Sequence, residues 1–283
     1  MRSFISRATR RTAPLALAVP LALLPLAGFA PAAQAATGPL CTSRTSQALA
    51  TKLTKDINTA LSGRSGTISV ALYDRRTGTG CSLGYDRRFD SASTVKVTVL
   101  ATALRRAQEQ HRSLTASEQK LITAMITQSD NDSTTALWTS LGTTRIRNFL
   151  TLAGMSETTL DPEGHWGLTQ ITARDELKLL ALLDSPNSVL TPTSQAYALK
   201  QMAAVVSSQR WGTPAGAPAG VTVRVKNGWL SRATLGWRVH SLGDFARGGS
   251  TYRLVVLSHG NATMDYGVGT IERVARAVHR DLN

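Results

Sequence analysis

The chain has only two cysteines and five histidines among its 283 residues. Neither cysteine, Cys41 or Cys81, has a histidine close by in the sequence, and the histidines are scattered without the spacing of metal ligands. The sequence therefore predicts neither a metal site nor a thiol nucleophile, and we expect no cofactor.

The chain after residue 40 also lacks long apolar runs, and the sequence has no basic run with interleaved aromatics. No stretch after residue 40 is long and apolar enough to span a membrane, and aromatic residues make up 5% of the chain. We therefore expect no nucleic-acid binding and no membrane insertion. Acidic residues are fewer than basic ones, with 18 Asp and Glu against 32 Lys and Arg. A dispersed basic surface favours anionic cell-wall polymers or carboxylate-bearing substrates.

The first 35 residues have the pattern of an export signal. They combine a basic start without acids, an apolar run over residues 14–30 and the small-x-small motif Ala33-Gln34-Ala35. Cleavage after Ala35 would release residues 36–283 as one secreted domain, free or associated with the cell wall. The pair Arg10-Arg11 leaves both the general and the twin-arginine export routes open. In an exported protein two cysteines suggest one disulfide, with two free thiols as the alternative.

The order of predicted elements is helix, two strands, a block of helices, three strands and a final helix. The first helix is indicated by apolar residues at every fourth position from Leu49 to Leu61, and the last by a similar stripe over residues 266–282. This order predicts an α+β fold in which strands from both ends of the chain form one five-stranded antiparallel sheet. The terminal helices would flank the sheet, and the middle helices would form a second lobe in a three-layer sandwich. The crevice between lobe and sheet is the expected pocket.

The segment Phe89–Lys96 carries the first chemical signal. A serine hydroxyl needs a base within hydrogen-bond reach to act as a nucleophile. On a helix Ser93 and Lys96 share one face, and the apolar residues that follow can bury that helix. Because desolvation lowers the pKa of a lysine, Lys96 is a candidate acceptor for the Ser93 proton.

A second Ser-x-x-Lys, Ser117-Glu118-Gln119-Lys120, has a simpler interpretation. Thr115 followed by Glu118 is typical of a capping box that opens a solvated helix. We expect this copy to have no catalytic role.

Two motifs lie downstream of the first copy. Ser129-Asp130-Asn131 is either a polar helix cap or a proton-passing serine beside a substrate-positioning amide. Lys226-Asn227-Gly228, at the end of a predicted strand, is either a hairpin turn or a substrate site. In the second case the lysine raises the positive potential, and the glycine lets substrate lie along the strand edge.

In this order, Ser-x-x-Lys, Ser-Asp-Asn and Lys-x-Gly resemble the motifs of the serine β-lactamase and penicillin-binding protein superfamily, most closely those of class A β-lactamases. Phe89 and Thr94, around the serine, are also similar to that family. The resemblance covers most of residues 36–283 and implies the β-lactamase/DD-peptidase fold. It also implies that Ser93 forms an acyl-enzyme, that Lys96 accepts or relays a proton, and that Ser129 passes a proton to the departing nitrogen.

The resemblance assigns substrate contacts as well. The set it implies consists of Asn131 for the acyl side-chain amide, Lys226 for the substrate carboxylate, Asn227 and Gly228 of the same motif, and Trp229. The backbone N–H groups of Ser93 and Trp229 would form the oxyanion hole.

The chain departs from the class A pattern in three places. The motif serines are only 36 residues apart, so the helical lobe must be shorter. Asn227 stands where the family has a hydroxyl, and the supporting cation could be Arg232, Arg238 or neither. In class A enzymes a loop glutamate activates the deacylating water and an asparagine follows four residues later. Here Glu163 is the candidate, but Gly167 takes the asparagine position. Glu163 could instead be an exposed loop acid, with His165 or Tyr85 activating the water.

The leading hypothesis is an exported, monomeric serine hydrolase that opens β-lactam amides. Its partner would be a small-molecule β-lactam or a cell-wall stem peptide. A D-Ala-D-Ala peptidase, an esterase or a slow penicillin-binding hydrolase could use the same serine. A cell-wall binding protein without turnover is the alternative from another class.

Overall fold

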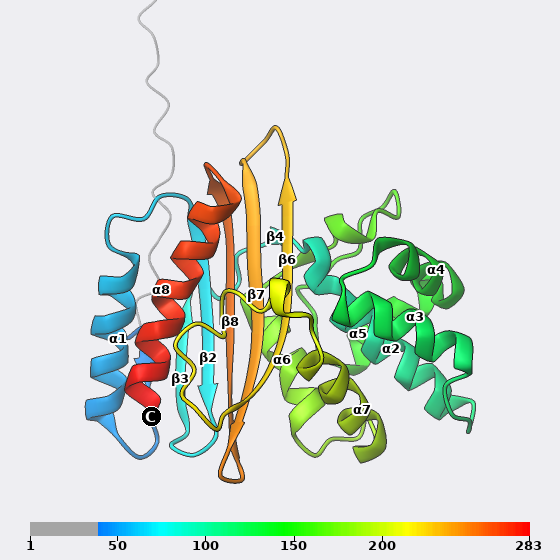
Figure 1. Ribbon diagram of the computed structural model, residues 1–283, viewed down its shortest axis with the longest axis horizontal. Coiled ribbons are helices and arrows are strands. Elements are labelled where there is room, and N and C mark those ends of the chain that lie inside the picture. Colours follow the sequence, from blue (N-terminus) through cyan, green and yellow to red (C-terminus); the bar gives the residue numbers. More distant parts are fainter. Residues whose placement is uncertain (1–38) are drawn as a thin grey trace, which may run out of the picture. The chain divides into compact units, whose positions relative to one another are not determined.

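The computed structural model describes residues 39–283, which are built around a six-stranded antiparallel sheet (Figure 1). In order across the sheet the strands are β1 (Cys41–Thr42), β3 (Thr79–Leu83), β2 (Thr67–Asp74), β8 (Ser250–Asn261), β7 (Trp237–Arg247) and β6 (Thr222–Ser231). The predicted antiparallel sheet is confirmed, but the expected number of five strands was wrong. The additional strand is β1, which is two residues long and therefore too short to show alternation in the sequence.

Helices α1 (Gln47–Leu61) and α8 (Met264–Leu282) cover one face of the sheet (Figure 1). Both are amphipathic, as predicted, and their apolar stripes are buried against the strands. The buried stripe residues include Leu53 and Ile57 of α1, and Ile271, Val274 and Val278 of α8. A hydroxyl side chain caps each N-terminus, Ser46 for α1 and Thr263 for α8.

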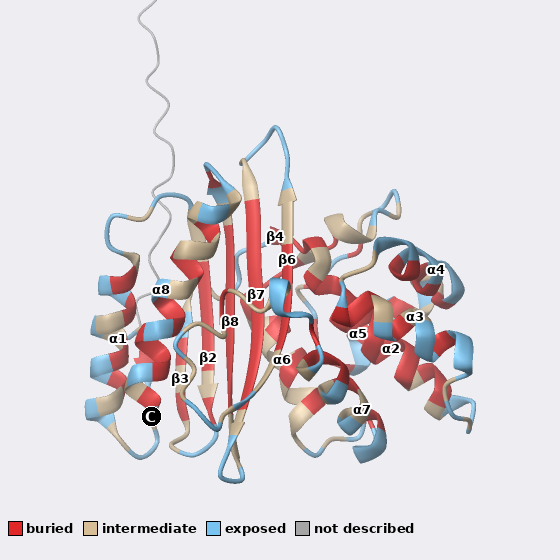
Figure 2. Cartoon of the chain, viewed as in Figure 1, coloured by how far each residue is buried: buried red, intermediate tan, exposed pale blue. Residues whose placement is uncertain are grey.

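The other face carries the helical lobe. Its members are α2 (Val95–Glu109), α3 (Ala116–Thr127), α4 (Asn131–Leu141), α5 (Thr143–Leu152), α6 (Ala173–Asp184) and α7 (Pro192–Ala203). Helix α2 is central, because twelve of its fifteen residues are buried. Buried residues gather on the sheet and on the inward sides of the helices (Figure 2), which gives the predicted three-layer order of helices, sheet and helices.

A short two-stranded pairing lies beside the main sheet. It joins β4 (Phe89–Asp90), just before Ser93, to β5 (Gln170–Ile171), at the end of the loop over residues 155–171. The three-residue 3₁₀ helix Trp166–Leu168 lies in the same loop. The pairing therefore fixes the end of this loop next to the start of the Ser93 segment.

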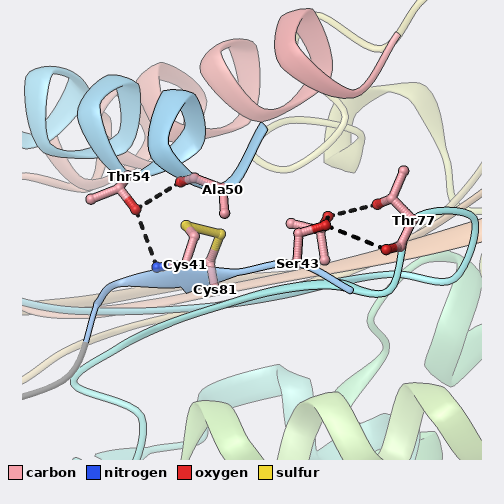
Figure 3. Close-up of a disulfide and its surroundings, with 7 residues drawn as sticks. Cys41, Ser43, Ala50, Thr54, Thr77 and Cys81 are labelled. Carbon is pink, nitrogen blue, oxygen red and sulfur yellow. Dashed lines mark hydrogen bonds between the residues drawn. A yellow bond between two sulfur atoms is a disulfide. The ribbon is translucent and has the colours of Figure 1, made fainter. Parts of the chain in front are cut away.

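Cys41 and Cys81 form a disulfide, which decides between the two alternatives left by the sequence (Figure 3). The two residues face each other across β1 and β3. The backbone N–H of Cys41 donates to Oγ1 of Thr54 in α1 at 3.2 Å, and that hydroxyl donates to the carbonyl of Ala50 at 2.8 Å (Figure 3). The edge strand is thus tied both to its neighbour and to the helix above it.

The predicted export signal, residues 1–35, lies outside the described residues. Within the described part, each helix is too short or too polar to cross a bilayer. Residues 39–283 also contain no group of three or more His, Cys, Asp and Glu side chains that could hold a metal ion.

Candidate active site

Ser93 lies at the start of α2, where a 3₁₀ turn (Ala92–Thr94) leads directly into the helix. Ser93 is half-buried, whereas all the remaining residues from 91 to 100 are buried. The turn is held by Thr94, whose hydroxyl donates to the carbonyl of Ser91 at 2.7 Å. Ala92 adopts a positive φ of 48°, which is uncommon for a residue with a Cβ and is typical of constrained functional turns.

Lys96 is completely buried one turn further along the helix. Its ammonium donates to the carbonyl of Ser129 at 2.6 Å, to the Ser129 hydroxyl at 3.2 Å and to Oδ1 of Asn131 at 2.8 Å. Burial lowers the pKa of Lys96 to about 8, because a charged amine loses its hydration there. A substantial fraction of Lys96 is therefore neutral near physiological pH and can accept a proton.

The Ser129 hydroxyl lies between two amines. It accepts from Lys226 Nζ at 2.9 Å and from Lys96 Nζ at 3.2 Å, and the residue itself has a positive φ of 60°. Burial, and next the charge of Lys96, hold the pKa of Lys226 well below its usual value. Since two buried ammonium groups disfavour each other, this pair readily gives up one proton. Asp130 caps α4 through the N–H of Ser133, so the motif is a helix cap as well as part of the site.

Strand β6 forms the wall opposite the Ser93 turn. The motif Lys226-Asn227-Gly228 was expected at the end of a strand, but it lies within β6. A Cβ on Gly228 would come within 2.9 Å of the backbone nitrogen of Ser93, so the two backbones are in direct contact there. Trp229, the next residue of the strand, lines the same cavity as Ser93.

Asn227 does not point into the cleft. It is 1% exposed, and its amide donates to the carbonyls of Gln209 and Trp211, both at 2.9 Å. Alternate residues of a strand point to opposite faces, so the side chain next to the inward-pointing Lys226 must turn away. The side chain of Asn227 is therefore engaged by backbone carbonyls and not by the cleft, and strand alternation was the signal that could have shown this.

A cavity of about 340 Å³ opens at this junction of the sheet and the lobe. Its lining residues are Ala92, Ser93, Asn131, His165, Trp166, Gly167, Leu168, Trp229 and Leu230. Another cavity, of about 310 Å³, lies away from Ser93 between α2 and α7. The reactive side chains, and not size, single out the first cavity as the candidate active site.

Asp90, three residues before Ser93, links β4 to β5 and to the β6–β7 hairpin, and it was not predicted as a site residue. Its carboxylate accepts from Arg238 Nε at 2.9 Å, from Arg232 Nη1 at 2.8 Å and from Gln170 Nε2 at 2.7 Å. Its carbonyl lies 2.8 Å from Nε2 of His240. Burial by itself would raise the pKa of Asp90, but these hydrogen bonds and the two guanidinium charges outweigh it and lower the pKa.

The Asp90 contacts also separate the two candidate arginines. The buried guanidinium of Arg238 is further engaged by the carbonyls of Thr234 and Gly236. The side chain of Arg232 is 40% exposed. Arg238 is therefore a structural partner of Asp90, and Arg232 is the arginine that a ligand could still reach.

Glu163 lies outside the cleft. Its side chain is 79% exposed, and its carboxylate is 3.7 Å from Nδ1 of His165. His165, in contrast, lines the cavity with Ser93. Tyr85 packs under the guanidinium of Arg174, 4.7 Å from its ring centre, and is not among the cavity-lining residues. Of the three groups considered for water activation, the structure brings only His165 to the cleft.

The second Ser-x-x-Lys copy, Ser117–Lys120, belongs to a capped helix and not to the site. Thr115 and Glu118 form the reciprocal capping box, with hydrogen bonds of 3.1 and 2.7 Å. Ser117 and Lys120 are exposed on α3, away from the cleft. The capping-box prediction is thus confirmed.

Comparisons with known proteins agree with this architecture. A model of the β-lactamase enzyme family matches residues 52–119 and 112–282. No curated protein matches the chain. Among solved structures, a class A β-lactamase reconstructed as an ancestor of those of Gram-negative bacteria is 22% identical, with a TM-score of 0.68 over 80% of this chain and 98% of that one.

Two further solved structures are similar in fold. A β-lactamase from Xanthomonas campestris is 19% identical, with a TM-score of 0.70 over 82% of this chain and 97% of that one. The TLA-3 extended-spectrum β-lactamase is 15% identical, with a TM-score of 0.73 over 82% of this chain and 98% of that one. The chain therefore belongs to the β-lactamase enzyme family, and it is a serine hydrolase of the β-lactamase type with the fold of class A enzymes.

Proposed function

We propose that this protein hydrolyses β-lactam amides through an acyl-enzyme on Ser93. One observation carries the proposal: the half-buried Ser93, at the start of a buried helix, lines the cleft, and Lys96 of the same helix forms one hydrogen-bonded chain with Ser129 and with Lys226 of β6. That chain supplies a base, a relay and a positive charge around one nucleophile.

In the acylation step, the Ser93 oxygen attacks the lactam carbonyl as its proton passes to neutral Lys96. The N–H groups of Ser93 and Trp229 would stabilise the oxyanion. When the C–N bond breaks, Ser129 donates its proton to the nitrogen and is reprotonated by one of the two lysines that contact it. Asn131 accepts from Lys96 through Oδ1, so its NH₂ group remains to hold the acyl side-chain carbonyl.

Lys226 and Arg232 differ in what they offer a substrate carboxylate. Lys226 is buried beneath the cleft and raises its potential, whereas Arg232 is partly exposed at the β6–β7 turn. A small anionic β-lactam fits this charge distribution. We further propose that the protein acts after export, with residues 1–35 as the signal, as the sequence pattern suggests.

The rival with a specific observation in its favour is a penicillin-binding hydrolase that deacylates slowly. The exposed position of Glu163 supports it, because the family's usual water-activating group is then missing from the cleft. This rival shares the Ser93 acylation step and differs only in the lifetime of the adduct.

The test uses the purified protein with a chromogenic cephalosporin and, separately, with a labelled penicillin. Turnover identifies a β-lactamase, and a long-lived adduct on Ser93 identifies the slow rival. Ser93→Ala should abolish both signals. The matched control is Ser117→Ala, in the exposed second copy of the motif, which should change neither. If Ser93→Ala still hydrolyses the cephalosporin, the proposal is wrong.

A further inference from the structure

The loop segment that begins at His165 is fixed against the Ser93 turn. The N–H of Ser91 donates to the carbonyl of Thr169 at 2.8 Å, and the Ser91 hydroxyl lies 3.3 Å from the carbonyl of Trp166. The indole N–H of Trp166 donates to Thr135 Oγ1 in α4 at 3.2 Å. His165 is therefore presented to the cleft by a segment anchored on two sides.

Asp161 orients the imidazole of His165. Its Oδ2 accepts from the backbone N–H of His165 at 3.0 Å and lies 3.0 Å from Nδ1 of the same residue. These hydrogen bonds, the backbone one first, lower the pKa of Asp161, so it is a carboxylate at neutral pH. A carboxylate can only accept, so the imidazole proton is placed on Nδ1. Nε2 is then the ring nitrogen whose lone pair is available to accept a proton.

The nearby carboxylate of Glu163 lies on the same side of the ring. Its oxygen is 3.7 Å from Nδ1, and its side chain is mostly exposed to solvent. Glu163 does not line the cavity that holds Ser93. The geometry separates the two loop groups: the side chain of His165 is 60% exposed but lines the cavity with Ser93, whereas that of Glu163 is 79% exposed and does not.

We propose that His165, oriented by Asp161, is the base that activates water for deacylation, in the place where Glu163 was expected to act. This inference rests on the proposed acyl-enzyme function. Nε2 takes a proton from a water molecule as the water oxygen bonds to the ester carbonyl carbon. The tetrahedral intermediate then releases the Ser93 oxygen, which receives the proton from the imidazolium. The products are the ring-opened acid and the regenerated serine.

The decisive variant is His165→Asn. Its amide nitrogen can keep the hydrogen bond that Nδ1 makes to Asp161, whereas the Nε2 position is lost. A positioned general base contributes about 10²- to 10⁴-fold, so deacylation should slow by roughly 100-fold or more. Because acylation is untouched, kcat and KM should fall together and kcat/KM should stay unchanged. Intact-mass measurement should show the penicillin adduct accumulating on Ser93.

Asp161 is a positioning residue, so its variant should also lower kcat and KM while leaving kcat/KM unchanged. Asp161→Asn should lower kcat and KM together by about tenfold or more, because the ring is no longer held in one tautomer. A purely structural defect would lower kcat/KM as well. Two controls come from the same region: Glu163→Gln is the competing assignment, and Glu157→Gln removes a partly exposed acid that pairs with Arg88 outside the cleft.

The outcomes distinguish this inference from the proposed function. Adduct accumulation in His165→Asn and Asp161→Asn, with turnover kept in both controls, supports it. Wild-type turnover in His165→Asn, or trapping by Glu163→Gln, overturns it. A long-lived adduct in the unaltered protein overturns it too, but leaves acylation by Ser93 in place. Absence of both turnover and adduct in the unaltered protein overturns both proposals.

Discussion

The contact between Gly228 and the Ser93 turn makes Gly228→Ala a stringent test of the cleft. A Cβ at this position would lie 2.9 Å from the backbone nitrogens of Ser93 and Thr94 and 3.1 Å from the carbonyl oxygen of Ser91. All three atoms belong to the backbone, so no flexible side chain can move aside. The strand or the turn must shift by several tenths of an ångström.

Gly228→Ala should lower both the stability of the protein and its catalytic rate. Overpacking a tight site costs about 1–3 kcal/mol, so the free energy of unfolding should fall by that amount. The same shift moves the Ser93 N–H away from the developing oxyanion. Loss of one such donor lowers the rate by about 10²- to 10³-fold, so kcat/KM for a cephalosporin should drop by roughly 100-fold.

Gly269 in α8 provides the matched control. A Cβ there meets no atom within 4 Å. Gly269→Ala should therefore raise the free energy of unfolding by about 0.5–1 kcal/mol, since alanine favours the helix, and should leave activity unchanged. Urea unfolding and initial rates measure both effects. If Gly228→Ala keeps wild-type kcat/KM and stability, the close approach of β6 to the nucleophile turn is not real.

Three further predictions concern proton transfer, the Asp90 contacts and the disulfide. Because a neutral amine accepts the Ser93 proton, kcat/KM should rise as pH increases through about 8, the pKa of Lys96. Lys96→Arg, whose side chain stays protonated, should abolish this rise. A pH-independent wild-type profile would contradict the assignment. Asp90→Asn should lower the free energy of unfolding at neutral pH by on the order of 3 kcal/mol, since it leaves the buried Arg238 charge uncompensated. The pKa of Asp90 is lowered on folding, so its contribution to stability is present above the unfolded pKa of about 3.9 and is lost as pH falls through the folded pKa. The difference in unfolding free energy between wild type and variant, measured by denaturant unfolding, should therefore shrink in acid. A constant difference would count against the ion pair. Replacing Cys41 and Cys81 by serine should cost roughly 4 kcal/mol by chain entropy for a separation of 40 residues, and equal unfolding midpoints with and without reductant would disagree with this.

The sequence predicted those features that depend on neighbours along the chain. The stripes of α1 and α8, the capping box of Thr115 and Glu118, and the buried helix after Ser93 all follow from interactions three or four residues apart. The three motifs were expected to meet in one cleft, and the hydrogen bonds of Lys96 and Lys226 to Ser129 place them there.

Features that depend on distant contacts could not be predicted in the same way. The two-residue β1 exists because it pairs with β3 and is linked to it by the disulfide, which no local pattern reveals. The network around Asp90 joins residues up to 150 positions apart. Nothing in the local sequence of Asp90 distinguishes a surface acid from this buried partner of two arginines.

The loop over residues 155–171 shows most clearly what the sequence by itself determined and what it did not. Helix and strand periodicity, together with the resemblance of the three motifs to a known family, were enough to predict the α+β fold and to suggest Ser93 and Lys96 as nucleophile and base, because periodicity fixes which side chains share a face. An irregular loop has no such period. Which of Glu163 and His165 lines the cavity with Ser93 was therefore decided by contacts that no period predicts, namely those of Ser91 with Trp166, of Asp90 with Gln170 and of Asp161 with the imidazole.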